Sequence, residues 1–117
     1  MPSKLSALES NIQMNWLLDF YGALLTEKQR EILSLYYQED YSLAEIAAQH
    51  GVSRQSVHDI LSRAGKHLLH YEAQLNLVER TLHATEQLNA AIRHLESGAY
   101  GQAQAEIRIA IQQFEGE

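Results

Sequence analysis

The chain of 117 residues has the length of one domain, or of one domain with an appendage, and its 45% hydrophobic content suffices for a packed core. The absence of cysteine excludes disulfides and thiolate chemistry, and no apolar run approaches the roughly 20 residues of a membrane-spanning helix, so we expect a cytoplasmic protein. The formal net charge of −6 counts against a generic nucleic-acid binder, because phosphate neutralisation supplies most of the affinity of such proteins.

Two helices are expected ahead of residue 42. The first runs from about Lys4 to Ala23, and the second begins after Thr26, which forms a capping-box pattern with Gln29. We interpret the aromatic residues of both helices as core rather than as a platform for base stacking. The expected inward residues are Leu5, Leu8, Ile12, Trp16, Leu17, Phe20 and Leu24 in the first helix and Ile32, Leu33, Tyr36 and Tyr37 in the second.

Residues 42–63 carry the spacing of a helix-turn-helix. Ser42 can cap a short helix, Gly51 supplies a left-handed turn at its end, and Ser53 can cap a second helix. Ala47 is small, as the crossing of two helices requires. The apolar faces repeat at spacings of three and four residues. They comprise Leu43, Ile46 and Ala47 in the first helix and Val57, Ile60 and Leu61 in the second.

The outer face of the second helix of this motif is the candidate nucleic-acid interface. We expect Arg54 and Gln55 to contact base edges or phosphates, and the amides after Ser53 to hold a phosphate. Arg63 and Lys66 are expected to contact the nucleic-acid backbone. The full set of candidate contacts is Ser53, Arg54, Gln55, Ser56, His58, Asp59, Arg63 and Lys66.

The charge is unevenly distributed along the chain. Residues 43–69 hold three basic and two acidic side chains, whereas residues 1–42 hold three and six, and residues 70–117 hold three and seven. One weakly basic motif would bind a duplex weakly, which favours a homodimer, a protein partner or a function without nucleic acid. A helix-turn-helix also serves as a structural corner or as a docking surface for proteins, so these alternatives stay open.

The helical pattern continues beyond the motif and predicts a long helix. It would run from Ser53 or Lys66 to Glu96, and Gly65 is a place where it could break or bend. A seven-residue repeat within it resembles a coiled-coil seam. The repeat consists of Leu68, Leu75 and Leu82, with Tyr71, Val78 and Thr85 between them.

A turn and a last helix complete a C-terminal helical hairpin. Ser97 and Gly98 end the long helix, and the last helix begins at about Gly101. We therefore expect an all-α fold with a helix-turn-helix domain over residues 1–66 and a hairpin over residues 67–117. We favour a homodimer through the hairpin, which could also dock a partner. The expected inward residues of the last helix are Ala103, Ile107, Ala110, Ile111 and Phe114.

The motifs of catalysis and cofactor binding are missing from the sequence. It has no glycine-rich phosphate loop, no cysteine and histidine cluster and no nucleophile elbow, so we expect no enzyme and no cofactor. His67 and His70 lie three residues apart, but no third ligand has a suitable spacing. We therefore predict surface histidines and no metal site.

Short blocks around the motif resemble those of a known family. Asp19-Phe-Tyr21, Leu24-Leu-Thr-Glu-Lys-Gln29 and Ser53-Arg-Gln55 occur in the order and at the separations of the YlxM family of small bacterial helix-turn-helix proteins. The resemblance covers about Asn15 to Ala64. The C-terminal hairpin is similar only in helical character and length.

The resemblance implies a function. Such proteins resemble region four of sigma factors and are linked to the signal recognition particle pathway chiefly by gene neighbourhood. It therefore implies a bacterial regulator or accessory factor of that pathway that binds DNA or RNA. The alternative is a module that docks on a component of the particle without sequence-specific DNA binding. Ser56 and His58 stand where the family usually has alanine and tyrosine, which bears on the target more than on the fold. The residues at the family's Ser-Arg-Gln-x-Val-x-Asp positions are Ser53, Arg54, Gln55, Val57 and Asp59.

Overall fold

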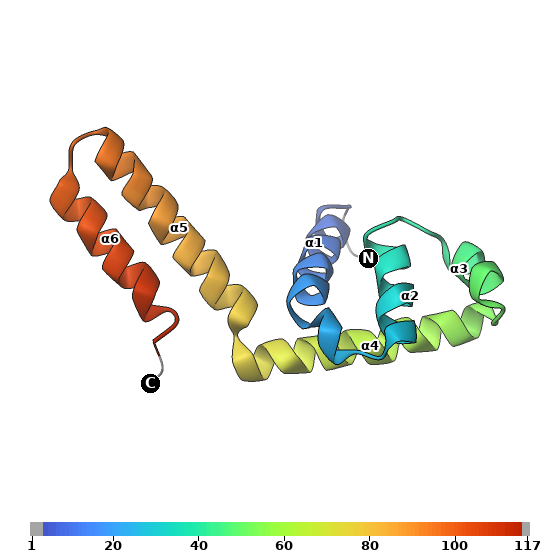
Figure 1. The fold of residues 1–117 in the computed structure, drawn as a ribbon. Helices are drawn as coiled ribbons and strands as arrows, with labels where there is room; N and C mark the ends of the chain where they lie inside the picture. Colours follow the sequence, from blue (N-terminus) through green and yellow to red (C-terminus); the bar gives the residue numbers. More distant parts are fainter. Residues whose placement is uncertain (1–3, 116–117) are drawn as a thin grey trace. The chain divides into compact units, whose positions relative to one another are not determined.

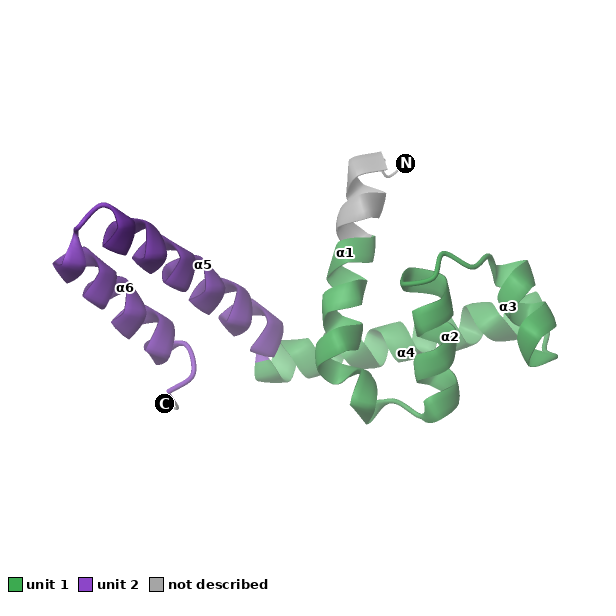
Figure 2. Ribbon diagram, turned by 45° about the horizontal axis from the view of Figure 1, so that its top comes forward, with its two compact units in different colours: residues 1–75 green, residues 76–117 purple. Residues whose placement is uncertain are grey.

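The computed structural model describes residues 4–115, with side chains described from Asn11 onward, and every regular element in this part of the chain is helical (Figure 1). This confirms the all-α fold class. The chain divides into two compact units, residues 1–75 and residues 76–117 (Figure 2). None of the described helices is long and apolar enough to span a membrane. In chain order the elements are α1 (Lys4–Tyr21), the 3₁₀ helix η1 (Gly22–Leu24), α2 (Glu27–Tyr37), α3 (Leu43–His50), α4 (Arg54–Leu75), α5 (Leu77–Glu96) and α6 (Tyr100–Gln112).

Capping boxes fix the starts of α2 and α3. The Thr26 hydroxyl accepts a hydrogen bond from the Gln29 backbone, and the Gln29 side chain accepts one from the Thr26 backbone, both at 3.1 Å, which confirms the predicted box. Ser42 and Glu45 form a second box, with distances of 2.9 and 3.1 Å. The hydrogen bond from the Ser42 backbone, and secondarily that from its side chain, lowers the pKa of Glu45.

The turn between α3 and α4 has the backbone that the sequence predicts. Gly51 adopts a left-handed conformation with φ of 67° and ψ of 35°, which a residue with a Cβ adopts only under strain. The Ser53 hydroxyl accepts a hydrogen bond from the Ser56 backbone at 3.0 Å and so caps α4. The side chains buried at the crossing are Ile46, Ala47, Val57 and Leu61. The helix-turn-helix of residues 42–63 is therefore present.

Helix α4 is the central helix of the first unit, and α1, α2 and α3 each pack against it (Figure 1). The hydroxyl of the buried Tyr21 in α1 donates a hydrogen bond to the Glu72 carboxylate in α4. A Cβ on Gly65 would lie 3.5 Å from Cε of Met14, and α4 runs through this glycine without a break. The further buried side chains among residues 11–75 are Met14, Leu17, Leu18, Ile32, Leu33, Ala64 and Leu68. Three helices thus hold α4 along most of its length.

The buried side of α1 differs from the predicted one. The helix has apolar residues on more than one side, and its contacts with α2 and α4 bury the side that contains Met14 and Tyr21. Periodicity alone cannot rank such sides. The inward residues that were predicted wrongly are Ile12, Trp16 and Leu24, which are 57%, 38% and 57% exposed. Leu17 is buried as predicted and Phe20 is half-buried, whereas Leu5 and Leu8 lie outside the described side chains.

The last turn of α2 is also more open than predicted. Ile32 and Leu33 are fully buried, which confirms their assignment to the core. Tyr37 is only half-buried, and Tyr36 is 36% exposed. The prediction of an inward Tyr36 was therefore wrong: the residue lies in the last turn of α2, which ends at Tyr37.

The long helix predicted from Ser53 or Lys66 to Glu96 is interrupted at Asn76. This residue has φ of 55° and ψ of 28°, the left-handed conformation that asparagine tolerates better than most residues. The predicted continuous seam was therefore wrong, because Leu68 is buried in the first unit whereas Leu82 belongs to the second. The expected domain boundary between residues 66 and 67 lies inside α4.

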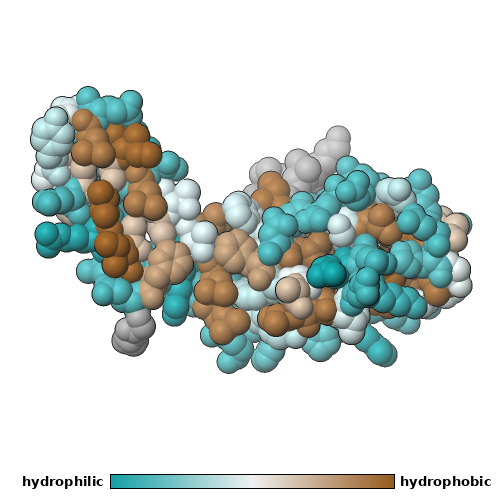
Figure 3. Space-filling model, viewed as in Figure 1, coloured by the Kyte–Doolittle hydropathy of each residue, from teal (hydrophilic) through white to brown (hydrophobic). Residues whose placement is uncertain are grey.

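The second unit is a hairpin of α5 and α6. Its turn lies at Ser97 and Gly98 as predicted, and Gly98 has a φ of 80°. Small side chains meet between the helices: Ala84, Ala91, Ala103 and Ala110 are at most 4% exposed. Two helices alone cannot enclose large side chains, so apolar residues remain open to solvent along the hairpin (Figure 3). Three residues expected to be inward remain exposed within the single chain: Ile107 and Ile111 of α6 and Phe114 after it, at 37%, 53% and 55%.

Candidate nucleic-acid interface

The predicted contact residues run from Ser53, directly before α4, to Lys66 in the middle of that helix. Val57, Leu61 and Ala64 of this helix are buried, so the positions between them form its outer face. Ser56 is half-buried beside the cap. The predicted contacts that are exposed are Ser53, Arg54, Gln55, His58, Asp59, Arg63 and Lys66. The structure therefore brings the predicted set together on one helix.

Asp59 lies at the centre of this outer face and organises its neighbours. The Gln55 side-chain amide donates a hydrogen bond to the Asp59 carboxylate at 3.0 Å. Nδ1 of His58 lies 3.9 Å from the same oxygen, an ion pair only when the imidazole is protonated, and both side chains are more than half exposed. Asp59 thus orients Gln55 and also places a negative charge where a phosphate would approach.

The first turn of α4 offers backbone donors. The N–H of Ser56 is used by the Ser53 cap, and the N–H of Val57 is bonded to the Ser53 carbonyl at 3.1 Å. The N–H groups of Arg54 and Gln55 precede them, where a helix has no internal acceptors. These two amides are the ones available to the predicted phosphate, beside the Arg54 guanidinium.

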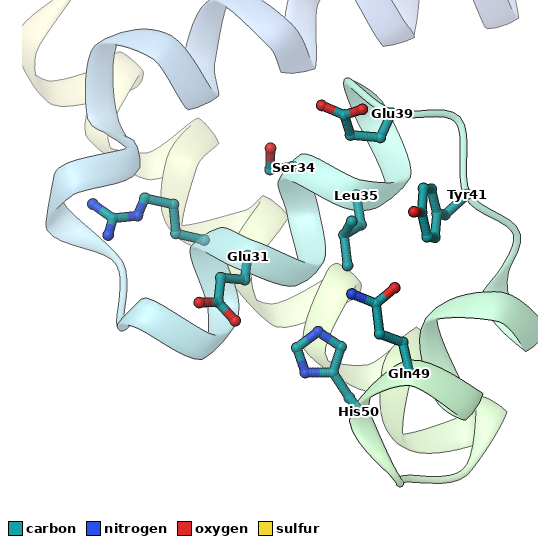
Figure 4. Close-up of a pocket in the computed structure, with 8 residues that line it drawn as sticks. Glu31, Ser34, Leu35, Glu39, Tyr41, Gln49 and His50 are labelled. Carbon is teal, nitrogen blue, oxygen red and sulfur yellow. The ribbon is translucent and has the colours of Figure 1, made fainter.

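A concavity of about 550 Å³ lies beside the motif, between α2, the loop after it and the end of α3 (Figure 4). Gln49 and His50 line it from α3, and Glu31 from α2. Carboxylates of Glu31 and Glu39 share its wall with Arg30 and His50, so a bound phosphate would face two negative charges. We therefore assign no nucleic-acid contact to this concavity.

Two further side chains adjoin the outer face of α4 and were missed by the sequence analysis. Ser62 is exposed one turn beyond His58, and helical spacing alone could have added it to the set. Tyr36 comes from α2 and lines a second concavity with His58 and Ser62. No sequence signal marks it, because its position depends on how α2 packs against α4.

A capped helix that follows a left-handed glycine turn, rests on three other helices and exposes polar side chains defines a helix-turn-helix protein. The chain belongs to the UPF0122 family, described as "Putative helix-turn-helix protein, YlxM / p13 like", whose sequence model matches residues 8–108. This confirms the resemblance to the YlxM family, and the description is that of a helix-turn-helix protein rather than of an enzyme.

Relatives from several bacteria are similar over most of the chain. The UPF0122 protein of Clostridium kluyveri is 44% identical over 92% of this chain and 96% of its own length. That of Latilactobacillus sakei is 50% identical over 83% of this chain and 80% of its own length. That of Geobacillus sp. (strain WCH70) is 53% identical over 62% of this chain and 66% of its own length. The family match thus spans the helix-turn-helix and much of the hairpin.

Proposed function

We propose that the protein binds DNA or RNA through the outer face of α4, as a cytoplasmic regulator or accessory factor of the bacterial signal recognition particle pathway. The observation that carries the proposal is the start of α4, where Val57 and Leu61 are packed in the core while Arg54, Gln55 and Arg63 are exposed. Membership in a helix-turn-helix family supports it. The pathway itself enters only through the resemblance to the YlxM family.

The charge of the outer face sets the expected strength of binding. Arg54, Arg63 and Lys66 carry three positive charges, and Asp59 carries one negative charge. With three phosphate contacts, the slope of log affinity against log salt concentration is roughly −3 per copy. This slope is much shallower than the slope of about −10 found for a tightly bound repressor. One copy would therefore bind weakly at physiological salt, and two joined copies would bind much more tightly.

We propose that two copies join through the apolar face of the hairpin. The face includes a depression of about 160 Å³ lined by apolar residues of both helices, and its members Ile111 and Phe114 are more than half exposed. A two-helix hairpin buries only small side chains by itself, and a second hairpin would complete a four-helix bundle. The exposed surface of the unit carries both positive and negative side chains, for example Arg93, Glu96 and Arg108. Two copies related by a two-fold axis can therefore place opposite charges next to each other.

The alternative function is that of a protein-interaction module. In that case the acidic hairpin would dock on a basic component of the signal recognition particle, and α4 would not read nucleic acid. The net charge of residues 76–117, with three basic and six acidic side chains, supports this alternative. We favour the nucleic-acid function, because the alternative leaves the exposed arginines of α4 without a role.

The experiment that tests the proposed function is a titration of isotope-labelled full-length protein with short DNA and RNA duplexes at low salt, followed by amide chemical shifts. We expect the shift changes to concentrate on residues 53–66. A parallel titration with purified signal recognition particle tests the alternative. Shift changes confined to the hairpin in that titration, with none on α4 in the presence of a duplex, would overturn the proposal.

A further inference from the structure

A small aromatic concavity adjoins the outer face of α4. It measures about 220 Å³ and lies between the end of α2, the start of α3 and α4. Its lining residues are Tyr36, Tyr37, Leu43, His58, Leu61 and Ser62. Pockets for drug-sized ligands and cofactors measure about 300–1,000 Å³, so this one suits a single planar ring system rather than a larger molecule.

The chemistry of the lining favours an uncharged aromatic group. The rings of Tyr36 and Tyr37 meet edge to face with centroids 5.0 Å apart, and Leu43 and Leu61 supply apolar walls. Burial, and secondarily the neighbouring Tyr36, raises the pKa of Tyr37, so its phenol stays neutral at physiological pH. No carboxylate lines this concavity, in contrast to the larger one beside α2 and α3.

Tyr36 presents part of its ring to solvent. It lies in the last turn of α2 and is 36% exposed. His58 approaches from α4 with a side chain that is 64% exposed, so two aromatic rings border the opening. Exposed tyrosine and histidine rings that flank a cationic surface are the groups on which unpaired bases stack.

The concavity is continuous with the candidate interface, because His58 belongs to both and Ser62 follows it one turn later. Arg54 lies one turn before His58 in α4, so a nucleic-acid backbone held there would pass beside the opening. We propose that the concavity binds one unpaired base of the nucleic acid on α4, stacked against Tyr36, an inference that rests on the proposed function. The Ser62 hydroxyl and the Tyr37 phenol can then donate or accept hydrogen bonds at the edge of the base.

The preferred ligand is therefore a duplex with a bulge rather than a perfect duplex. The base can come from RNA or from DNA, since both present the same aromatic faces. Stacking depends little on base identity, so the preference concerns an unpaired base and not one sequence. A bulge also lowers the cost of extruding a base, because that base has no pairing partner to lose.

The test compares four fluorescently labelled hairpin probes: RNA and DNA, each fully paired or with one unpaired adenosine in the stem. Full-length protein is titrated into each at one low salt concentration, and anisotropy gives the dissociation constant. We expect the bulged probe to bind roughly fivefold or more tightly than its paired counterpart, in the range that one base stacked on an aromatic ring supplies. The RNA and DNA arms show which source provides the base.

Substitutions of Tyr36 connect this preference to the concavity. Tyr36→Leu should abolish the preference for the bulge, and Tyr36→Phe should retain it. Tyr100→Leu, which changes a 68% exposed tyrosine of the hairpin, is the matched control and should retain it as well. Circular dichroism verifies that each variant is folded.

The outcomes separate the inference from the proposed function. Equal binding of paired and bulged probes, or a preference that survives Tyr36→Leu, would overturn the inference and leave the proposed function intact. If neither kind of probe binds at low salt, the proposed function fails and the inference fails with it. A bulge preference that is lost only with Tyr36→Leu supports both.

Discussion

The Gln55 side chain is tied to Asp59 one turn later in α4, with 3.0 Å between the amide nitrogen and the carboxylate oxygen. This bond fixes the direction of a side chain that would otherwise sample several rotamers at an exposed site. Asp59 also places a negative charge five residues after Arg54 and four before Arg63. The outer face of α4 thus combines the positioned Gln55 amide with the Asp59 carboxylate. Because the carboxylate repels phosphates, it lowers the affinity of this face for nucleic acid of any sequence.

Removal of the Asp59 charge is expected to strengthen non-specific binding. Asp59→Asn retains a hydrogen-bonding group next to Gln55 but removes the repulsion toward phosphates, so we expect affinity for an arbitrary duplex to rise about threefold at low salt and less at high salt. Fluorescence anisotropy measures the change. Glu86→Gln, the same charge change on an exposed residue of the hairpin, is the control and should have less effect. Weaker binding of Asp59→Asn would contradict this role for Asp59.

The bond between Tyr21 and Glu72 is expected to stabilise the first unit. It joins α1 to the far part of α4, and its donor is a buried phenol. Tyr21→Phe should lower the free energy of unfolding by about 1–2 kcal/mol, because the ring stays packed while a hydrogen bond to a carboxylate is lost. Urea denaturation at neutral pH measures the change. An unaltered midpoint and slope would show that the bond contributes nothing net.

Substitution by alanine is expected to change the stability of the protein in opposite directions at Gly65 and Gly51. Gly65 is buried within α4, and an added Cβ would make an ordinary contact of 3.5 Å with Met14, so Gly65→Ala should stabilise the protein by about 1 kcal/mol through helix propensity. Gly51→Ala should destabilise it by about 1 kcal/mol, because its φ of 67° is left-handed. Thermal and urea denaturation measure both. A loss of stability in Gly65→Ala would mean that Met14 cannot adjust.

The hairpin face is expected to hold two copies together. Ile111→Asp places a charge beside the apolar depression and should yield monomers in sedimentation velocity at concentrations where the unaltered protein is dimeric. Ile109→Asp is the matched control: Ile109 is 40% exposed on the same helix, does not line the depression and should leave the dimer intact. An unaltered protein that remains monomeric throughout would contradict the dimer and direct attention to a different partner for the hairpin.

The sequence predicts best those parts of the fold that depend on local chemistry. The caps at Thr26, Ser42 and Ser53 and the left-handed Gly51 were predicted correctly, because each depends on a few neighbouring residues. Asn76 was missed because asparagine only tolerates the left-handed region and does not demand it. The buried side of α1 was missed because its choice depends on contacts with α4, which lie some fifty residues away along the chain.

In the candidate site too, the sequence predicts what depends on local spacing and misses what depends on contacts between helices or on rotamers. The outer face of α4 follows from helical spacing once its core residues are known, so the predicted contacts from Ser53 to Lys66 lie together as expected. The aromatic concavity joins Tyr36 to His58 from two helices, and no periodicity links those positions. The bond between Gln55 and Asp59 has the four-residue spacing of helical neighbours, yet which partner Gln55 selects depends on rotamers that the sequence does not specify.

The most direct test of the central claim, that α4 binds nucleic acid through its outer face, is the salt dependence of duplex binding by an Arg54→Ala, Arg63→Ala double variant. Removal of two phosphate contacts should weaken binding at low salt and reduce the slope of log affinity against log salt by roughly 2 per copy, with the helical content unchanged. An Arg80→Ala, Arg93→Ala double variant, which changes two exposed arginines of the hairpin, controls for net charge. A slope and an affinity equal to those of the unaltered protein, or equal losses in both double variants, would contradict the claim.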